Sequence, residues 1–196
     1  MMTRIYLASR SPRRAELLQQ IGVEFVVLPS DIDESVYNAE PAADYVLRLA
    51  REKARACAGK LAVLDMPVLA ADTTVCVDGD ILGKPQDDDE AYAMLASMSG
   101  GWHEVHTAIA LASGKGVETA LSTTRVKMAS LNHELIAAYV ASGEPRDKAG
   151  AYGIQGLGGT LIERIEGSYS GVMGLPLFET ATLLRNCGFA IPGRAA

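Results

Sequence analysis

The sequence predicts a mixed α/β fold in one domain spanning residues 1–196, built either as a single body or as two lobes around a cleft. Segments with helical periodicity alternate with β-rich segments, and no repeat, low-complexity tract or Pro/Ser-rich linker interrupts them. The chain is long enough to bury a proper core, because 48% of its 196 residues are hydrophobic. Its 21% of charged residues also favours an ordinary globular protein over a disordered one.

The first half of the chain is expected to alternate strands with helices. Serine is a favoured N-cap and proline a favoured first helical residue, so Ser11 and Pro12 begin a helix that Gly22 ends. The expected elements are a strand at residues 4–9, a helix at 12–21, a strand at 24–28, the acidic loop PSDIDES, a helix from Pro41 to Gly59 and a short buried strand at 67–71.

The second half is expected to contain the longest strands. The stretch VCVDGDIL predicts a hairpin, because Asp-Gly tolerates the positive φ of a tight turn, and Asp87 with Glu90 resembles a helix capping box. The expected elements after the hairpin are a helix to about Gly100, strands at 102–112 and 117–129 joined by residues 113–116, a helix from Asn132 to about Ser142, the glycine-rich loop KAGAYGIQGLGG, a strand at 160–165 and a helix at 176–187.

Charge, cysteine content and hydropathy exclude several classes of protein. A formal net charge of −6 disfavours a nucleic-acid backbone binder, which needs a basic surface. The three cysteines are too far apart for a zinc knuckle or a redox pair, and the three histidines have no ligand spacing. There is no signal-like start and no membrane-length apolar run, so we expect a cytoplasmic protein that binds neither membrane nor nucleic-acid polymer.

The stretch LASRSPRRAELL predicts an anion site. It places serines and arginines where a strand leads into a helix, and the free N–H groups and positive dipole end of the helix favour phosphate there. In the alternative reading Ser11 only caps the helix and Arg13 and Arg14 are solvated, although cations at a helix N-terminus cost stability. Neither a Walker A loop nor a GxGxxG follows the first strand.

Two carboxylates are the candidates for metal binding. Asp72 in AADTTV is expected at the C-terminal end of a buried strand, where open α/β sheets bind ligands, and Glu34 lies in DIDES. Oxygen ligands suit magnesium or manganese, and such a metal could bridge phosphate oxygens while one carboxylate activates water. The alternative for Glu34, and the commoner fate of such clusters, is a solvated acidic loop.

Three lysines and a glutamine could complete a ligand site. Lys84 in LGKP and Lys148 in DKAGAYG sit on rigid turns, whereas Lys53 lies on an amphipathic helix, where a lysine is usually solvated. Gln155 in the glycine-rich loop offers a donor and an acceptor to a base edge. Taken singly, each lysine could equally be a surface residue and the loop a plain glycine turn.

Seven motifs occur in one order along the chain: SRSPRR, DIDES, AREKA, AADTTV, LGKP, DKAGAYGIQG and GSYSGVMGLP. Together they closely resemble the Maf-like nucleoside triphosphate pyrophosphatases, from about Ile5 to Leu184. The resemblance implies a fold similar to the inosine triphosphate pyrophosphatases: a long twisted mixed sheet flanked by helices, with two lobes around a nucleotide cleft. It also implies a homodimer.

The same resemblance implies hydrolysis of the bond between the α and β phosphates of a nucleoside triphosphate, with a divalent cation, Mg²⁺ or Mn²⁺. Asp72 matches the proton acceptor that activates water, and Glu34 with Asp72 matches the metal site. The residues matching the phosphate cradle are Ser9, Arg13, Arg14, Lys53, Lys84 and Lys148. Because adjacent helical residues cannot point the same way, only one of Arg13 and Arg14 is expected to touch phosphate directly.

Arg13, Thr73 and Gln155 match the positions that distinguish the subfamilies. Their combination resembles the dTTP/UTP branch, which could clear modified pyrimidine nucleotides from the pool. Two alternatives stay open: the sibling branch that acts on 7-methyl-GTP, which typically has a tyrosine where Arg13 stands, and a nucleotide-binding regulator of septum formation that does not hydrolyse its ligand.

Overall fold

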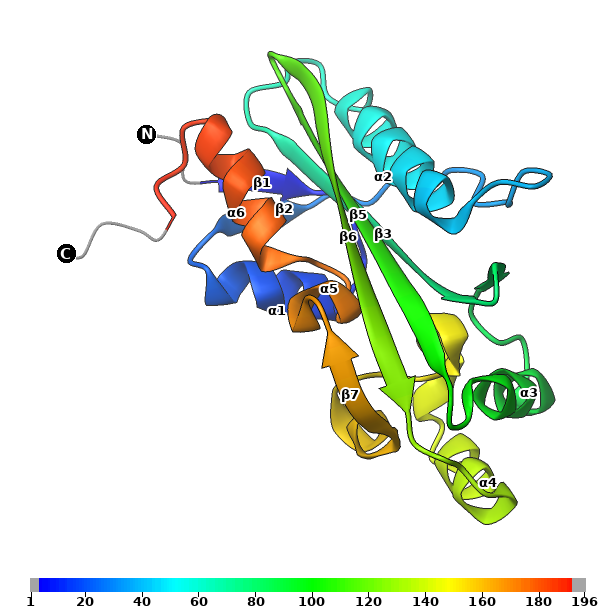
Figure 1. Ribbon diagram of the computed structural model, residues 1–196. Coiled ribbons are helices and arrows are strands. Elements are labelled where there is room, and N and C mark those ends of the chain that lie inside the picture. Colours follow the sequence, from blue (N-terminus) through cyan, green and yellow to red (C-terminus); the bar gives the residue numbers. More distant parts are fainter. Residues whose placement is uncertain (1–3, 192–196) are drawn as a thin grey trace.

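The computed structural model describes residues 4–191, and within them a seven-stranded mixed sheet forms the centre of the molecule (Figure 1). The strand order is β2-β1-β3-β5-β6-β7, with β4 paired to β3. β1 runs parallel to β2 and β3, whereas the pairs β3–β5, β5–β6 and β6–β7 are antiparallel. The strands are β1 Arg4–Leu7, β2 Glu24–Val27, β3 Val68–Val77, β4 Asp80–Leu82, β5 Trp102–Ser113, β6 Gly116–Met128 and β7 Ile162–Glu166.

Helices flank this sheet, so the predicted mixed α/β architecture is confirmed. The α-helices are α1 Pro12–Gln20, α2 Ala42–Ala58, α3 Asp88–Met98, α4 His133–Ala141, α5 Tyr169–Val172 and α6 Leu177–Asn186. Three 3₁₀ helices, η1 Glu144–Asp147, η2 Ala149–Ala151 and η3 Gly156–Leu161, lie in and before the glycine-rich loop. Every strand and helix lies within a few residues of its predicted position, except that α5 and the 3₁₀ helices were not predicted and β3 is longer than predicted.

The helix caps follow the predicted signals in two of three cases. Asp87 accepts a hydrogen bond from Glu90 N at 2.8 Å, and Asn132 accepts one from Leu135 N at 2.9 Å. Ser11 occupies the N-cap position of α1, but its side chain makes no capping hydrogen bond. Instead, Ser9 Oγ accepts a hydrogen bond from Ser11 N at 3.2 Å, so the predicted capping role of the Ser11 hydroxyl is wrong.

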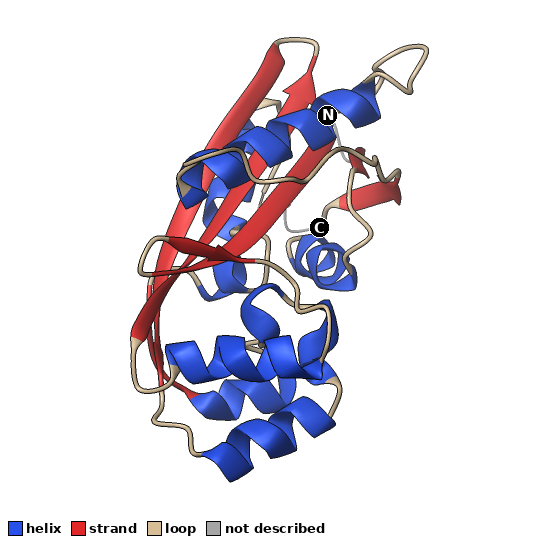
Figure 2. Ribbon diagram, turned by 90° about the vertical axis from the view of Figure 1, so that its right-hand side faces the viewer, coloured by secondary structure: helices blue, strands red, loops and turns tan. Residues whose placement is uncertain are grey.

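The molecule has two lobes (Figures 1 and 2). Three clusters of buried side chains form their cores. In the first lobe the sheet is covered on both faces: alternate residues of β3 and β5 pack against α2 on one side and against α1 and α6 on the other. In the second lobe, α3 and α4 cover the far ends of β3, β5 and β6. The long strands therefore hold the two lobes together. The prediction of one domain over residues 1–196 extends beyond the described residues and stays a prediction.

β3 is a single ten-residue strand, which corrects the prediction of a short strand ending before Asp72. It continues because β5 pairs with it from Val68 to Cys76, so the polar residues in its middle do not interrupt the ladder. On its other edge, β1 pairs only with Val68 and Leu69, and β4 pairs only from Val75 onward. Asp72 therefore lies in the interior of β3, where this second edge faces no strand among residues 4–191.

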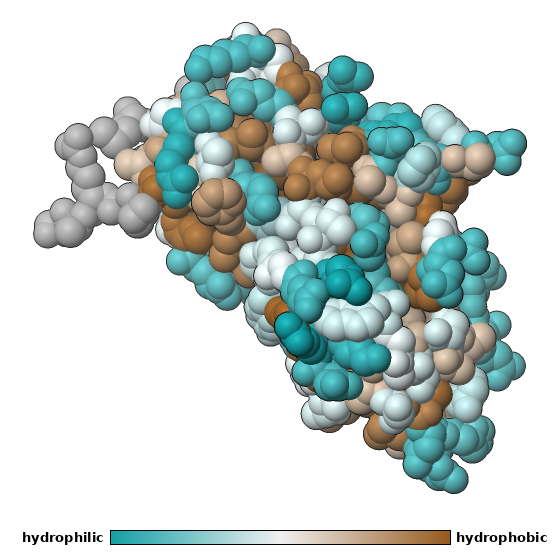
Figure 3. Space-filling view, viewed as in Figure 1, coloured by the Kyte–Doolittle hydropathy of each residue, from teal (hydrophilic) through white to brown (hydrophobic). Residues whose placement is uncertain are grey.

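The lengths of the helices and the distribution of apolar residues on the surface bear on contacts with membranes and partners. Within residues 4–191, no helix has the length and apolarity needed to cross a bilayer. On the face shown in Figure 3, apolar residues appear in separate patches among hydrophilic ones. Phe178 of α6, 77% exposed, is an example of an exposed apolar side chain. The predicted homodimer stays a prediction.

Candidate active site

A cavity of about 860 Å³ opens beside the free edge of β3 and is lined by residues from both lobes. Every residue predicted for the site lines it: Ser9, Arg13, Arg14, Glu34, Lys53, Asp72, Thr73, Lys84, Lys148 and Gln155. They come from segments spread over most of the chain, so the fold brings them together. Their individual roles stay predictions.

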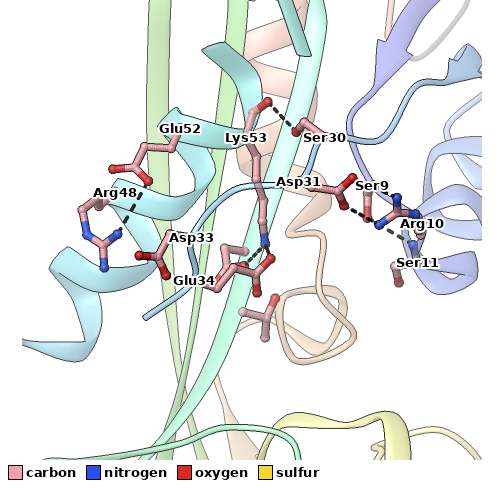
Figure 4. A network of polar contacts seen from close by, with 12 residues as sticks. Ser9, Arg10, Ser11, Ser30, Asp31, Asp33, Glu34, Arg48, Glu52 and Lys53 are labelled. Atoms are coloured by element: carbon pink, nitrogen blue, oxygen red, sulfur yellow. Dashed lines mark hydrogen bonds and ion pairs between the residues drawn. The ribbon is translucent and has the colours of Figure 1, made fainter. Parts of the chain in front are cut away.

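Lys53 joins the two predicted metal ligands. Its ammonium extends from α2 toward Glu34 (Figure 4), with Nζ 2.8 Å from Glu34 Oε1 and 2.6 Å from Asp72 Oδ1. Lys53 is 9% exposed and Asp72 6% exposed, so the alternative in which this lysine is a solvated surface residue is wrong. The surrounding helix and strand bury it because Val46, Ala50 and Ala54 of α2 pack against the same face of β3.

The environment of Asp72 raises its affinity for a proton. Burial raises the pKa of Asp72 above the usual value of 3.8, and the nearby charges of Lys53 and Arg14 oppose that rise without cancelling it. A carboxyl held this way is closer to the proton affinity that suits a general base than an exposed aspartate is. Such perturbed carboxyl groups are common at functional sites.

Glu34 and Asp72 could hold a divalent cation together with an anionic ligand. Both carboxylates already reach one cationic group, Lys53 Nζ, so a single ion could also bridge them. Among the described residues, no cluster of three or more His, Cys, Asp or Glu side chains could hold a metal alone. This donor set fits magnesium, which often takes one or two carboxylates and completes its shell with water and phosphate oxygens.

Arg13 and Arg14 diverge, as their adjacent positions predict. Arg14 donates from Nε to Gly174 O at 2.8 Å, and from its two Nη atoms to Ser9 Oγ and Thr73 Oγ1. These three acceptors hold the guanidinium in place and leave two of its five N–H groups for a ligand. Arg13 contacts a different residue: its Nη1 lies 3.4 Å from Asp147 Oδ2.

Lys84, Lys148 and Gln155 line the side of the cavity formed by the second lobe. Lys148 Nζ donates to Glu144 O at 2.6 Å and to Asp147 Oδ1 at 2.7 Å. Lys84 is exposed, and the preceding Gly83 accepts a hydrogen bond from Gly150 N, which ties the LGKP turn to η2. Lys84 and Lys148 thus line the same cavity as Asp72 and Lys53.

Several residues that line the cavity had no role predicted from the sequence. The motif GSYSGVMGLP supplies Gly174, whose carbonyl anchors Arg14 and whose φ of +109° favours glycine. Tyr45, Tyr152 and Glu144 also line the cavity. The motif was visible in the sequence, but its partner Arg14 lies 160 residues away, so only the fold reveals the contact.

The loop that carries Glu34 is fastened to α2 by Arg48. Its Nε and Nη2 contact the two carboxylate oxygens of Glu40 at 2.7 Å each, and Nη2 also donates to Ser35 O at 2.9 Å. The guanidinium lies 3.8 Å from the ring centroid of Tyr37. Figure 4 shows Arg48 on the same helix as Lys53, close to the loop residues Asp33 and Glu34.

We expect Arg48→Lys to loosen this loop, because lysine keeps the charge but cannot form the two-pronged contact. Amide hydrogen exchange in residues 33–40 should quicken by an amount corresponding to about 1.5–3 kcal/mol of lost local stability. Arg51→Lys on the same helix is the control, since Arg51 is exposed and contacts Thr119 outside the loop. Equal exchange in both variants would contradict the role given to Arg48.

Comparison with known proteins gives consistent matches. The family model described as Maf-like protein matches residues 4–187. A dTTP/UTP pyrophosphatase of Methylobacillus flagellatus is 82% identical over 192 residues, covering 98% of this chain and 96% of the relative. Proteins of the same name from Hahella chejuensis and Chromobacterium violaceum are 53% and 52% identical, covering 96% and 97% of this chain and 94% and 98% of the respective relative.

Proposed function

The chain belongs to the Maf-like protein family, and from this premise we propose that it hydrolyses dTTP and UTP to the nucleoside monophosphate and pyrophosphate. The relatives named dTTP/UTP pyrophosphatase support this substrate choice. The observation that carries the proposed chemistry is the buried Asp72 beside Lys53 and Glu34, in a cavity lined by further cations. The proposed cleavage is at the bond between the α and β phosphates.

The charge distribution supports a polyphosphate ligand. A nucleoside triphosphate carries about four negative charges near neutral pH, whereas the whole protein has a formal charge of −6. The cavity is less acidic than the protein as a whole, because six lysines and arginines line it against five aspartates and glutamates. Arg14, held by three acceptors, and Lys53, Lys84 and Lys148 would bind the phosphates and stabilise charge on the leaving pyrophosphate.

In this proposal Asp72 takes the proton of the attacking water. The raised pKa of Asp72 suits that role. When the nucleotide binds, the ammonium of Lys53 would move from the Asp72 carboxylate to contact a phosphate oxygen. Glu34 and Asp72 would hold a divalent cation, which when bound supplies charge neutralisation and a lower pKa for a coordinated water. The cleft between the lobes would restrict bulk water around the reacting phosphates.

Gln155 and Thr73 are proposed to govern the choice of base. Gln155 precedes η3 at the cavity wall and can offer both a donor and an acceptor to a pyrimidine edge.

We expect Gln155→Ala to raise KM for dTTP by about tenfold, more than for other triphosphates, because one hydrogen-bonded contact is lost. Thr73→Ala should act in the same direction, partly through Arg14, which Thr73 contacts. KM values across several bases check this, and a uniform rise would contradict base recognition by these residues.

The proposed activity is tested by pyrophosphate release across dTTP, UTP, other natural triphosphates and 7-methyl-GTP, with Mg²⁺ or Mn²⁺ varied. We expect monophosphate and pyrophosphate from dTTP and UTP, and dependence on the divalent cation. Faster release from 7-methyl-GTP would assign the chain to the sibling branch instead. Binding without release from any nucleotide would favour the regulator, and the proposed hydrolysis would then be wrong.

A further inference from the structure

Two side chains outside the phosphate site fasten the segment that carries Gln155. At the start of this segment, Gly153 N donates to the hydroxyl of Tyr139 at 3.2 Å. That hydroxyl donates in turn to Glu144 Oε1 at 2.9 Å. At the end of the segment, Gly158 N donates to the same Oε1 at 2.9 Å and Leu157 N donates to Oε2 at 3.0 Å. Residues 153–158 are therefore held at both ends by one linked pair.

The pair is built into the core of the second lobe. Tyr139 of α4 is 4% exposed and belongs to the cluster around α3 and α4. Burial works to raise the pKa of Glu144, but hydrogen bonds from the N–H groups of Gly158 and Leu157 and from Tyr139 outweigh it and hold the pKa below 4.5. The Glu144 carboxyl is thus ionised near neutral pH and accepts strong, charge-assisted hydrogen bonds.

The segment fits closely against this pair. A Cβ added at Gly156 would lie 2.7 Å from Glu144 Oε2. One added at Gly158 would clash first with the carbonyl oxygen of Gly153 and would lie 2.6 Å from the Tyr139 hydroxyl. Gly156 also has a φ of +72°, which favours glycine. The turn on either side of Gln155 is therefore packed against Tyr139, Glu144 and the backbone of Gly153, and side chains larger than hydrogen at Gly156 or Gly158 would displace it.

Glu144 also contacts the phosphate side of the cavity through its main chain. Its carbonyl oxygen accepts a hydrogen bond from Lys148 Nζ at 2.6 Å. One residue therefore links the lysine predicted to bind phosphate with the loop predicted to contact the base. Its carboxylate oxygens accept hydrogen bonds from the loop amides and from Tyr139, so both are engaged in holding the segment.

We propose that Tyr139 and Glu144 are positioning residues for base selection, which set the place of Gln155 relative to the phosphates. This inference rests on the proposed function. Tyr139→Phe removes the hydroxyl that joins Gly153 to Glu144, and Glu144→Gln replaces one acceptor with an NH₂ group that cannot accept from the loop. Both variants keep the shape of the side chain.

We expect each variant to raise KM for dTTP about tenfold with little change in kcat, and to lower the preference for dTTP over dGTP by a similar factor. The double variant should lose less than the product of the two effects, because both act through the same segment. If part of the variant protein were unfolded, the apparent kcat would fall by the same factor for dTTP and dGTP, and KM would stay unchanged.

Matched controls come from the same lobe. Tyr92→Phe removes a hydroxyl that contacts His133 Nδ1 at 2.8 Å, and Glu90→Gln alters a carboxylate that accepts from Gln86 N at 2.7 Å. Neither residue lines the cavity. Both controls should keep the wild-type preference for dTTP.

The dissociation constants of dTTP and dGTP, measured by calorimetry on the same variants, separate this inference from the proposed hydrolysis. If wild-type protein binds dTTP selectively without cleaving it, the hydrolysis proposal fails, and loss of selective binding in the two variants still supports the positioning role. An unchanged dTTP preference in Tyr139→Phe and Glu144→Gln would overturn the inference. So would an equal loss for both nucleotides, or wild-type protein that binds neither.

Discussion

Replacing Asp72 with asparagine is expected to lower the turnover of dTTP by about two to four orders of magnitude while sparing nucleotide binding. Asparagine keeps the size of the side chain but cannot accept a proton from water. Single-turnover pyrophosphate release measures the chemical step, and calorimetry with a dTTP analogue that carries a non-hydrolysable α–β linkage measures binding. A turnover within about tenfold of wild type would remove Asp72 from the role of general base.

The pH profile gives an independent reading of the same residue. Because burial raises the pKa of Asp72, the acid side of the kcat/KM profile should have an apparent pKa above 3.8. Below that pH the carboxyl is protonated and cannot accept a proton, so the rate falls as pH falls. In the Asp72→Asn variant, the residual kcat/KM should no longer show this fall at acid pH. An acid step that persists unchanged would belong to another group.

Replacing Lys53 with methionine is expected to reduce both stability and activity. Methionine has similar length but no charge, so it leaves the buried Asp72 carboxylate without its closest cation. Breaking such a buried pair typically costs about 3–5 kcal/mol of unfolding free energy. Turnover should fall about 10²–10³-fold, because a cation predicted to stabilise the phosphates is also lost. Denaturant unfolding and pyrophosphate release measure the two effects.

The loss of stability should depend on pH in a defined direction. Without Lys53 the pKa of Asp72 in the folded protein rises further above its unfolded value. A carboxyl with a raised folded-state pKa stabilises the fold fully at pH below its unfolded pKa, and this contribution is lost as pH rises through the folded pKa. The Lys53→Met deficit should therefore be small in acid and large near neutral pH.

A double variant separates stability from function. Combining Lys53→Met with Asp72→Asn removes both charges, so most of the lost stability should return while activity stays low. Lys115→Met, at the exposed turn between β5 and β6, serves as the control and should change neither property. A double variant as unstable as Lys53→Met alone would show that the deficit does not come from the uncompensated charge of Asp72.

Local sequence signals were sufficient where neighbouring residues determine the structure. The Asp-Gly turn between β3 and β4 has the predicted positive φ values, 49° at Asp78 and 96° at Gly79, because this backbone geometry depends on two residues alone. The Asp87 and Asn132 caps and the order of helices and strands were predictable for the same reason. The seven ordered motifs also indicated which residues would line the cavity.

Contacts between distant segments could not be read in this way. The motifs placed Lys53 in the phosphate cradle, but a lysine on an amphipathic helix is usually solvated, so its burial could not be foreseen. The strand before Asp72 was predicted to be short, because the polar residues Asp72, Thr73 and Thr74 follow its apolar run. Pairing with β5 instead carries β3 through Asp72, and burial under α2 places Lys53 between Asp72 and Glu34. The sequence alone thus determined the elements and the residue types of the site, because these depend on local chemistry. Tertiary structure decided which charges meet, because burial and pairing depend on segments far apart in the chain.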